Sequence, residues 1–343
     1  VRCMAAQRAL DEPLYALGLP RGRAAAVAGA GVIEGDGGPA AGASDGLRTC
    51  YILHGLLGTH KNWVGYAKLL GKTFPGWRFV LPDLRNHGRS PFKDGPHSLA
   101  ACARDVMALF DVHGVPDSVI GHSLGGKVAL QLVNELRGAD AMPAGGLTVW
   151  CLDAIPGAVP LSAVETPATE SVSKVLEFVK DIRLPIQSRA WLKREVEARG
   201  FTGSIGAWLA SNVTRHVSDS AGGGSIDRRG DAGTGAASDE HVWSFDPDAA
   251  ADLMMDYMES DLWHVLDGAA SGAGGLKLRM VLAEFSSRWQ NEELAKRVAS
   301  LEAQAARAPQ SALHFHRLPK SGHWVHVDNP QGLLQAFQSS GLG

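Results

Sequence analysis

The stretch "VIGHSLGGKVAL", residues 119–130, constrains the fold of this chain more than any other. An apolar run typical of a buried strand stops at Gly121, a serine follows at position 123, and a helical apolar pattern begins after two more glycines. Side chains in place of these glycines would clash inside a sharp strand-to-helix turn. The pattern, Gly121-His122-Ser123-Leu124-Gly125, therefore predicts a turn that presents the Ser123 hydroxyl above the carboxyl end of a strand.

Segments typical of strands and helices alternate on both sides of this turn. Strand-like runs occur at 47–55, 77–81, 117–123, 145–157, 275–285 and 312–319, and helical patterns at 62–74, 98–115, 125–138, 291–305 and 330–340. Strands joined through helices lie parallel, with helices on both faces of the sheet. We therefore predict an α/β fold with a mostly parallel, twisted sheet.

A long helical stretch interrupts this alternation. Residues 157–265 have mainly helical periodicity, and inside them the Gly-, Asp- and Ser-rich tract 218–240 has almost no apolar side chains. Such a tract buries too little surface to order itself, so we expect a flexible excursion there. The predicted organisation is an N-terminal extension (1–25), a core made of 26–156 and 266–343, and a helical cap between its two parts.

Charge and cysteine content narrow the classes of partner. The formal net charge of −3 gives no electrostatic footprint for nucleic acid. No run of about 18 apolar residues occurs, so no membrane span is predicted. The four cysteines form no CxxC pair, which argues against zinc and redox motifs. The expected partner is a small molecule, and the sequence requires no cofactor.

The N-terminal segment gives a weak indication of location. "VRCMAAQRALDE", at the start of the chain, is rich in Ala and Arg. This composition fits the end of a transit peptide for a chloroplast or mitochondrion, and equally a plain N-terminal helix or tail of a cytoplasmic protein.

A serine hydroxyl reacts only when a base takes its proton and an acid orients that base. His323 follows the last predicted strand and is the expected base, with His326 as the competitor. Asp153 and Glu284 each end a predicted strand and are the candidate acids. The segment "EFSSRW" after the later strand has serines where an acid is expected, so we favour Asp153 and keep Glu284 as the alternative.

Two backbone amides and several aromatic side chains complete the predicted site. The "HGLLG" turn at 54–58 and the start of the helix after Ser123 would offer the amides of Leu56 and Leu124 to an oxyanion. Several aromatic residues are expected either to line an acyl pocket or to pack in the core. They are Trp208, Trp243, Phe245, Trp263 and Trp324. His314 and His316 lie near each other on a strand, but no suitably spaced acidic or Cys ligand accompanies them, so no metal is predicted.

These motifs together resemble the α/β-hydrolase family, most closely its small single-domain esterases from bacteria, mitochondria and plastids. The resemblance covers residues 48–340 and rests on "HGLLG" (54–58), "DLRNHGRS" (83–90), "GHSLGGK" (121–127), "LDAIP" (152–156) and "GHWVH" (322–326). It implies Ser123 as nucleophile, His323 as base and Asp153 as acid, with Leu56 and Leu124 at the oxyanion-hole positions.

The expected reaction is hydrolysis of an ester or thioester of a small or medium acyl substrate through an acyl-enzyme, as in a carboxylesterase or thioesterase. Dehalogenases and epoxide hydrolases need a carboxylate nucleophile, and Ser123 argues against both. Two alternatives use the same residues. One is a ligand-binding protein of this fold without turnover, and the other is C–C bond hydrolase or haloperoxidase-like chemistry with the same triad.

Overall fold

The computed structural model describes residues 31–34, 46–159, 172–215, 241–272 and 274–343. Its centre is a seven-stranded sheet in the order β1-β3-β2-β4-β5-β8-β9. The strands are β1 (Gly31–Glu34), β2 (Arg48–Leu53), β3 (Trp77–Leu81), β4 (Ser118–His122), β5 (Leu147–Leu152), β8 (Leu276–Ala283) and β9 (Leu313–Leu318). Within this seven-stranded sheet, β1 is the one strand that pairs antiparallel with its neighbour. The predicted mostly parallel sheet is therefore confirmed.

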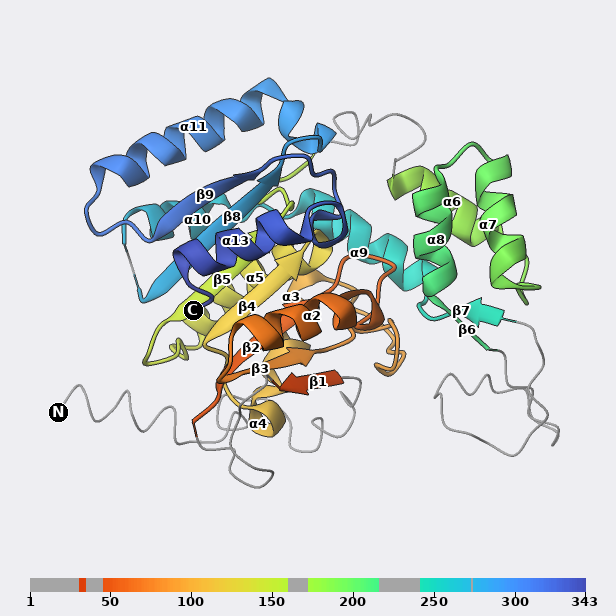
Figure 1. The fold of residues 1–343 in the computed structure, drawn as a ribbon, viewed down its shortest axis with the longest axis horizontal. Coiled ribbons are helices and arrows are strands. Elements are labelled where there is room, and N and C mark those ends of the chain that lie inside the picture. The colour runs from red at the N-terminus through yellow and green to blue at the C-terminus, as the bar shows by residue number, and fades with distance from the viewer. Residues whose placement is uncertain (1–30, 35–45, 160–171, 216–240, 273) are drawn as a thin grey trace.

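Helices cover both faces of this sheet (Figure 1). One face carries α2 (Lys61–Thr73), α12 (Val325–Asp328) and α13 (Pro330–Ser340), and the other carries α3 (Leu99–Met107), α5 (Leu124–Gly138), α10 (Trp263–Ala270) and α11 (Glu292–Arg307). Because successive strand side chains point to opposite faces, Tyr51 and Leu53 of β2 pack with α3 and α5, while Cys50 and Ile52 pack with α2 and α13. Every residue of β2, β4 and β5 except Arg48 is therefore buried, as expected of central parallel strands.

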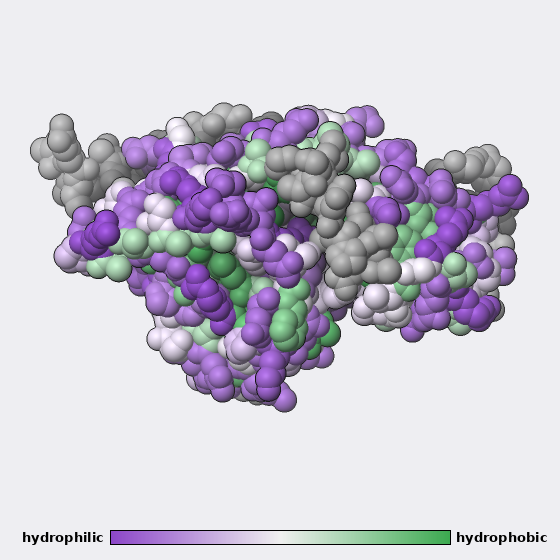
Figure 2. All heavy atoms as spheres, turned by 90° about the horizontal axis from the view of Figure 1, so that it is seen from above, coloured by the Kyte–Doolittle hydropathy of each residue, from purple (hydrophilic) through white to green (hydrophobic). Residues whose placement is uncertain are grey.

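The helical segment between β5 and β8 forms a smaller block beside the sheet (Figure 1). It contains α6 (Val172–Asp181), α7 (Arg189–Ala198), α8 (Gly203–Ser211), the short strands β6 (Val213–Arg215) and β7 (His241–Trp243), and α9 (Pro247–Glu259). Seen from above, hydrophobic atoms form separate patches on the main body and on this block, within a mostly hydrophilic surface (Figure 2). The helix α10, which crosses the predicted cap boundary at 265, packs on α5, α11 and β8.

Three local features differ from the sequence-based expectation. The helix expected at 98–115 is capped by Ser98, whose hydroxyl accepts the amide of Ala101, but it is divided into α3 and α4 (Phe110–His113). The strand β1, which pairs with β3 at the sheet edge, is not among the strand-like runs of the sequence. The antiparallel pair β6–β7 was not predicted either.

The predicted extension 1–25 and the tract 218–240 lie outside the described residues. In the described part of the chain, no helix combines the length and the apolar character that a membrane crossing needs.

Candidate active site

Ser123 occupies the turn between β4 and α5, with φ 53° and ψ −118°. L-amino acids rarely adopt this left-handed region, so close packing must hold the backbone there. A Cβ on Gly121 would lie 2.1 Å from the carbonyl oxygen of Gly125, and one on Gly125 would lie 2.4 Å from that of Leu53. The glycines are therefore required by close backbone approaches, as the sequence pattern predicted.

His323 lies between Ser123 and Asp153. Its Nε2 is 3.1 Å from the Ser123 Oγ, and its Nδ1 is 2.7 Å from the Asp153 Oδ2. The three residues come from the ends of β4, β5 and the loop after β9, which meet at the carboxyl edge of the parallel sheet. A hydroxyl, an imidazole and a carboxylate are thus connected by two hydrogen bonds, the arrangement that a nucleophile, a base and an orienting acid require.

Asp153 is fully buried and accepts several hydrogen bonds in addition to that of His323. The donors are the Ser286 hydroxyl at 2.9 Å, the Trp289 indole at 2.7 Å and the Ala283 amide at 3.2 Å. Burial alone would raise the pKa of Asp153, but the hydrogen bond and charge of His323, with the Arg288 charge and the Trp289 bond, hold that pKa below its usual value. Asp153 is therefore an ionised acceptor that fixes the imidazole.

The surroundings of His323 favour its neutral form. Burial lowers its pKa from 6.5, and the nearby charge of Arg288 lowers it further, against the opposing effect of Asp153. His122, the variable residue of the serine motif, donates from Nε2 to the carbonyl oxygen of His323 at 2.7 Å. This bond holds the backbone that carries the base, and no sequence pattern had assigned that task to His122.

The alternative acid and the alternative base lie elsewhere. Glu284 is exposed, and its carboxylate accepts the backbone amide of Lys320 at 2.7 Å. The ring of His326 stacks on that of Trp63, with 3.9 Å between centroids. The structure thus brings Asp153 to the His323 imidazole, and it places Glu284 and His326 in other contacts.

Leu56 and Leu124 line the same cavity as Ser123. Neither amide donates to another group among the described residues. The next residue, Leu57, has a φ of 59° and donates its amide to His87 Nε2 at 3.2 Å. Burial lowers the pKa of His87 to about 3, so this ring stays neutral and can accept the bond.

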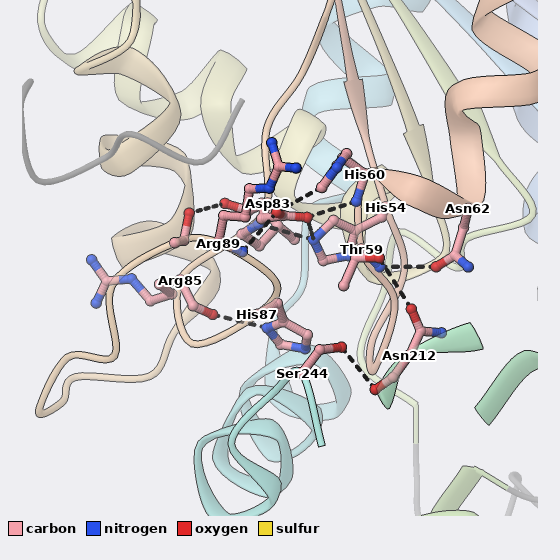
Figure 3. Close-up of polar contacts among 12 residues, drawn as sticks. His54, Thr59, His60, Asn62, Asp83, Arg85, His87, Arg89, Asn212 and Ser244 are labelled. Atoms are coloured by element: carbon pink, nitrogen blue, oxygen red, sulfur yellow. Dashed lines mark hydrogen bonds and ion pairs between the residues drawn. The ribbon is translucent and has the colours of Figure 1, made fainter. Parts of the chain in front are cut away.

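A buried cluster around Asp83 supports the turn that carries Leu56 (Figure 3). The Asp83 carboxylate accepts the amide of His60 at 2.6 Å, its Nδ1–H at 2.8 Å, and the amide of Arg89 at 2.9 Å. His54 joins the same two loops, since its Nε2 accepts the amide of Leu84 at 2.9 Å. The sequence signal for this cluster was the "DLRNHGRS" motif, which entered only through the family resemblance.

The same loops are bonded to the helical insertion (Figure 3). The Thr59 hydroxyl donates to Asn212 Oδ1 at 3.1 Å, and the carbonyl oxygen of the fully buried Asn212 accepts the Ser244 hydroxyl at 2.7 Å. In turn, the Ser244 carbonyl accepts the amide of Gly88. The predicted oxyanion turn is therefore held between the sheet and the insertion.

A cavity of about 790 Å³ opens above Ser123 and His323. Of the predicted pocket aromatics, Trp208 and Trp324 line it, with ring centroids 5.9 Å apart. Trp243 and Phe245 do not line it; they stack on each other with centroids 5.3 Å apart, both nearly fully buried. Their aromatic character reflects packing of β7 against the core, a role that sequence alone cannot separate from substrate contact.

His314 and His316 lie 4.5 Å apart between ring centroids on β9, and His316 Nε2 is 3.2 Å from the Ser340 hydroxyl. No group of three or more His, Cys, Asp or Glu side chains within the described ranges is arranged to hold a metal ion.

The sheet order, the turn after β4 and the converging strand ends define the α/β-hydrolase class. The model of the alpha/beta hydrolase family matches residues 51–336, and the chain belongs to this family. Among curated relatives, the sn-1-specific diacylglycerol lipase of Mus musculus is 33% identical over 148 residues, which are 38% of this chain and 48% of that protein. The probable alcohol acetyltransferase of Saccharomyces cerevisiae is 40% identical over 86 residues, 24% of this chain and 25% of that protein.

These matches span about half of the mouse relative and a quarter of the yeast one. Among solved structures, a marine microorganism esterase superposes with a TM-score of 0.61 over 91% of this chain and 98% of its own, at 20% identity. At that identity the likeness concerns the fold alone. The family match over residues 51–336 places this chain in a family of hydrolases.

Proposed function

We propose that this chain is a serine hydrolase that cleaves an ester or thioester of a small or medium acyl substrate. The observation that carries the proposal is the pair of hydrogen bonds at His323, 3.1 Å to Ser123 and 2.7 Å to Asp153. The lipase activity named for the mouse relative supports carboxylic ester chemistry. A cavity of about 790 Å³ is large enough for such a substrate.

In the proposed mechanism, Ser123 Oγ attacks the carbonyl carbon while its proton passes to His323 Nε2. Asp153 stabilises the resulting imidazolium, and the amides of Leu56 and Leu124 bind the oxyanion. The imidazolium then protonates the leaving alcohol or thiol. A water molecule next gives a proton to Nε2 and attacks the acyl-enzyme, and the proton returns to Ser123 as the acid leaves.

We further propose that α6 to α9 act as a cap over this site. Residues of α6, α8 and α9 line the cavity opposite Ser123, among them Val175, Trp208 and Met254. Most of this wall is apolar, which suits an acyl chain.

The test compares wild type with Ser123→Ala on p-nitrophenyl esters from acetyl to dodecanoyl, with the exposed Ser339→Ala as a matched control. We expect wild type and the control to turn over part of the series, and Ser123→Ala to lose at least about 10⁴-fold in kcat. A fluorophosphonate probe should label both active proteins and spare Ser123→Ala.

The alternatives predict other results. A ligand-binding protein without turnover would neither hydrolyse an ester nor take the probe. A hydrolase of narrow specificity, including C–C bond or haloperoxidase-like chemistry, would take the probe at Ser123 and leave every p-nitrophenyl ester intact.

A further inference from the structure

Two cationic residues line the cavity beside Ser123 and His323. Arg288 and Lys320 both belong to its wall, and neither cationic group has an ion-pair or hydrogen-bond partner among the described residues. Among the described lining residues the carboxylate is that of Asp328, and it accepts the amide of Gly322 at 2.9 Å. The wall therefore carries more positive than negative charge.

Arg288 is held firmly in this position. It lies in the 3₁₀ turn Ser287–Gln290, and the side chains on either side of it in the sequence, Ser286 and Trp289, both donate to the carboxylate of Asp153. The backbone that carries the guanidinium is thus fixed to the acid of the proposed triad. The hydrogen bonds from Ser286 and Trp289 to Asp153 therefore also place the backbone of Arg288 beside the proposed triad.

Lys320 is held at the same cavity by two backbone bonds. Its amide donates to Glu284 Oε2 at 2.7 Å, and the amide of Phe285 donates to the carbonyl oxygen of Ser321 at 2.8 Å. These bonds join the loop after β8 to the loop after β9. Both cations therefore come from neighbouring loops, and they line the same cavity as the apolar side chains of the insertion.

The charge of Arg288 also works against the reaction unless something offsets it. A positive guanidinium near His323 opposes formation of the imidazolium, and it contributes to the lowered pKa of that residue. An anionic group of the substrate bound to Arg288 would remove this opposition. A guanidinium binds a carboxylate or phosphate through two parallel hydrogen bonds, which gives orientation as well as affinity.

We propose that Arg288, with Lys320, binds an anionic group of the substrate, so that the preferred substrate is an ester or thioester that also carries a carboxylate or a phosphate. This inference rests on the proposed function, because it assigns a substrate class to the same site. The apolar side chains of the insertion would hold the chain between the anionic group and the scissile carbonyl.

The kinetic test compares p-nitrophenyl hexanoate with two esters of similar length, mono-p-nitrophenyl adipate and p-nitrophenyl ω-phosphonooxyhexanoate. For wild type we expect kcat/KM to be at least about tenfold higher for one anionic ester than for the neutral one. Arg288→Gln should lower this anionic-to-neutral ratio by about 10- to 100-fold, and Arg288→Lys should keep part of it. The better of the two anionic esters distinguishes a carboxylate from a phosphate.

The matched control is Arg194→Gln, since Arg194 is exposed on α7 and does not line the cavity. It should leave the ratio unchanged. Equal kcat/KM for all three esters, with no change of ratio in Arg288→Gln, would overturn the inference and leave the proposed hydrolase standing.

A binding measurement separates the inference from turnover. In the Ser123→Ala background, calorimetry with adipate and with hexyl phosphate should show that adding Arg288→Gln weakens at least one of them about tenfold. Unchanged binding of both would contradict the inference even if no ester is hydrolysed. Loss of every hydrolytic activity with intact Arg288-dependent binding would instead contradict the proposed function alone.

Discussion

Asp153 and Glu284 both follow a strand of the sheet, and their surroundings give them different chemistry. Asp153 is fully buried among four donors, one of which is the His323 imidazole. Glu284 is exposed and binds a backbone amide. The sequence favoured Asp153 because "EFSSRW" has serines where an aspartate is expected, and two of the residues in that segment, Ser286 and Trp289, are donors to Asp153.

Asparagine at position 153 keeps the shape of the side chain and removes its charge. We expect Asp153→Asn to lower kcat by about 10⁴-fold, because an amide neither stabilises the imidazolium nor selects the correct tautomer. Glu284→Gln should change kcat by less than about twofold, since the residue touches no reacting group. Steady-state kinetics on one ester, with a melting curve to check folding, makes the comparison; similar losses in both variants would contradict the assignment.

The pH profile reports the protonation of His323. The reaction needs the neutral imidazole, and burial and Arg288 lower its pKa below 6.5. Activity should therefore fall as the pH drops through that lowered pKa and reach a plateau above it. Removing the charge in Arg288→Gln should move the acid limb to higher pH. The measurement is kcat/KM for a neutral ester against pH, and a limb centred above 6.5 in wild type would show that the base is not buried as described.

At the scale of elements, the crossing of β4, α5 and β2 depends on the glycines of the serine turn. Gly125 lies at the start of α5 against the backbone of β2, and Gly138 ends the same helix with no atom within 4 Å of its Cβ position. The two glycines share a helix and differ in their surroundings. They offer a matched pair for testing the packing of the turn.

We expect Gly125→Ala to destabilise the protein by about 3 kcal/mol or more, because the new Cβ would meet the carbonyl oxygen of Leu53 at 2.4 Å. Gly138→Ala should be neutral or stabilise by about 0.5–1 kcal/mol, since alanine has the higher helix propensity. Urea unfolding of both variants measures the difference. Equal stability of the two would mean that the backbone at the turn can move apart at little cost.

The sequence predicted the long elements well and the short ones poorly. The apolar runs that became β2, β4 and β5 are buried on both faces, so their composition alone is informative. The strands β1, β6 and β7 have only three or four residues, too few for a periodic pattern, and depend on a distant partner. Tertiary pairing rather than local propensity decides such elements.

At the scale of the whole molecule, contacts between distant segments limit the prediction of the site, as they limit the prediction of short strands. Ser123 and His323 could be predicted because the chemistry requires particular residue types at particular strand ends. The support of the oxyanion turn by Asp83 and His87, and its bond to Asn212 of the insertion, join segments far apart in sequence. Such contacts leave no local pattern, so they become visible only when the chain is folded.

The folded chain also buries an unusual set of neutral histidines. Burial lowers the pKa of His54, His122, His87 (to about 3) and His326 (to about 4). In the unfolded chain these groups titrate near 6.5. Above that pH neither state is protonated, whereas below it the unfolded state binds more protons, so stability must fall as the pH drops from about 6.5 toward the folded pKa values.

We expect the free energy of unfolding to be lower at pH 5.5 than at pH 7.5 by about 2.5 kcal/mol or more, since His87 and His326, with pKa values of about 3 and about 4, each contribute about 1.4 kcal/mol per pH unit below the unfolded pKa. That loss is a large part of the whole stability of a typical domain, about 5–15 kcal/mol. Urea unfolding at the two pH values measures it, and His326→Gln should reduce the difference by about 1 kcal/mol because one titrating group is gone. Equal unfolding free energies at both pH values would mean that the folded protein accepts these protons as readily as the unfolded chain. That result would contradict the burial of the four rings.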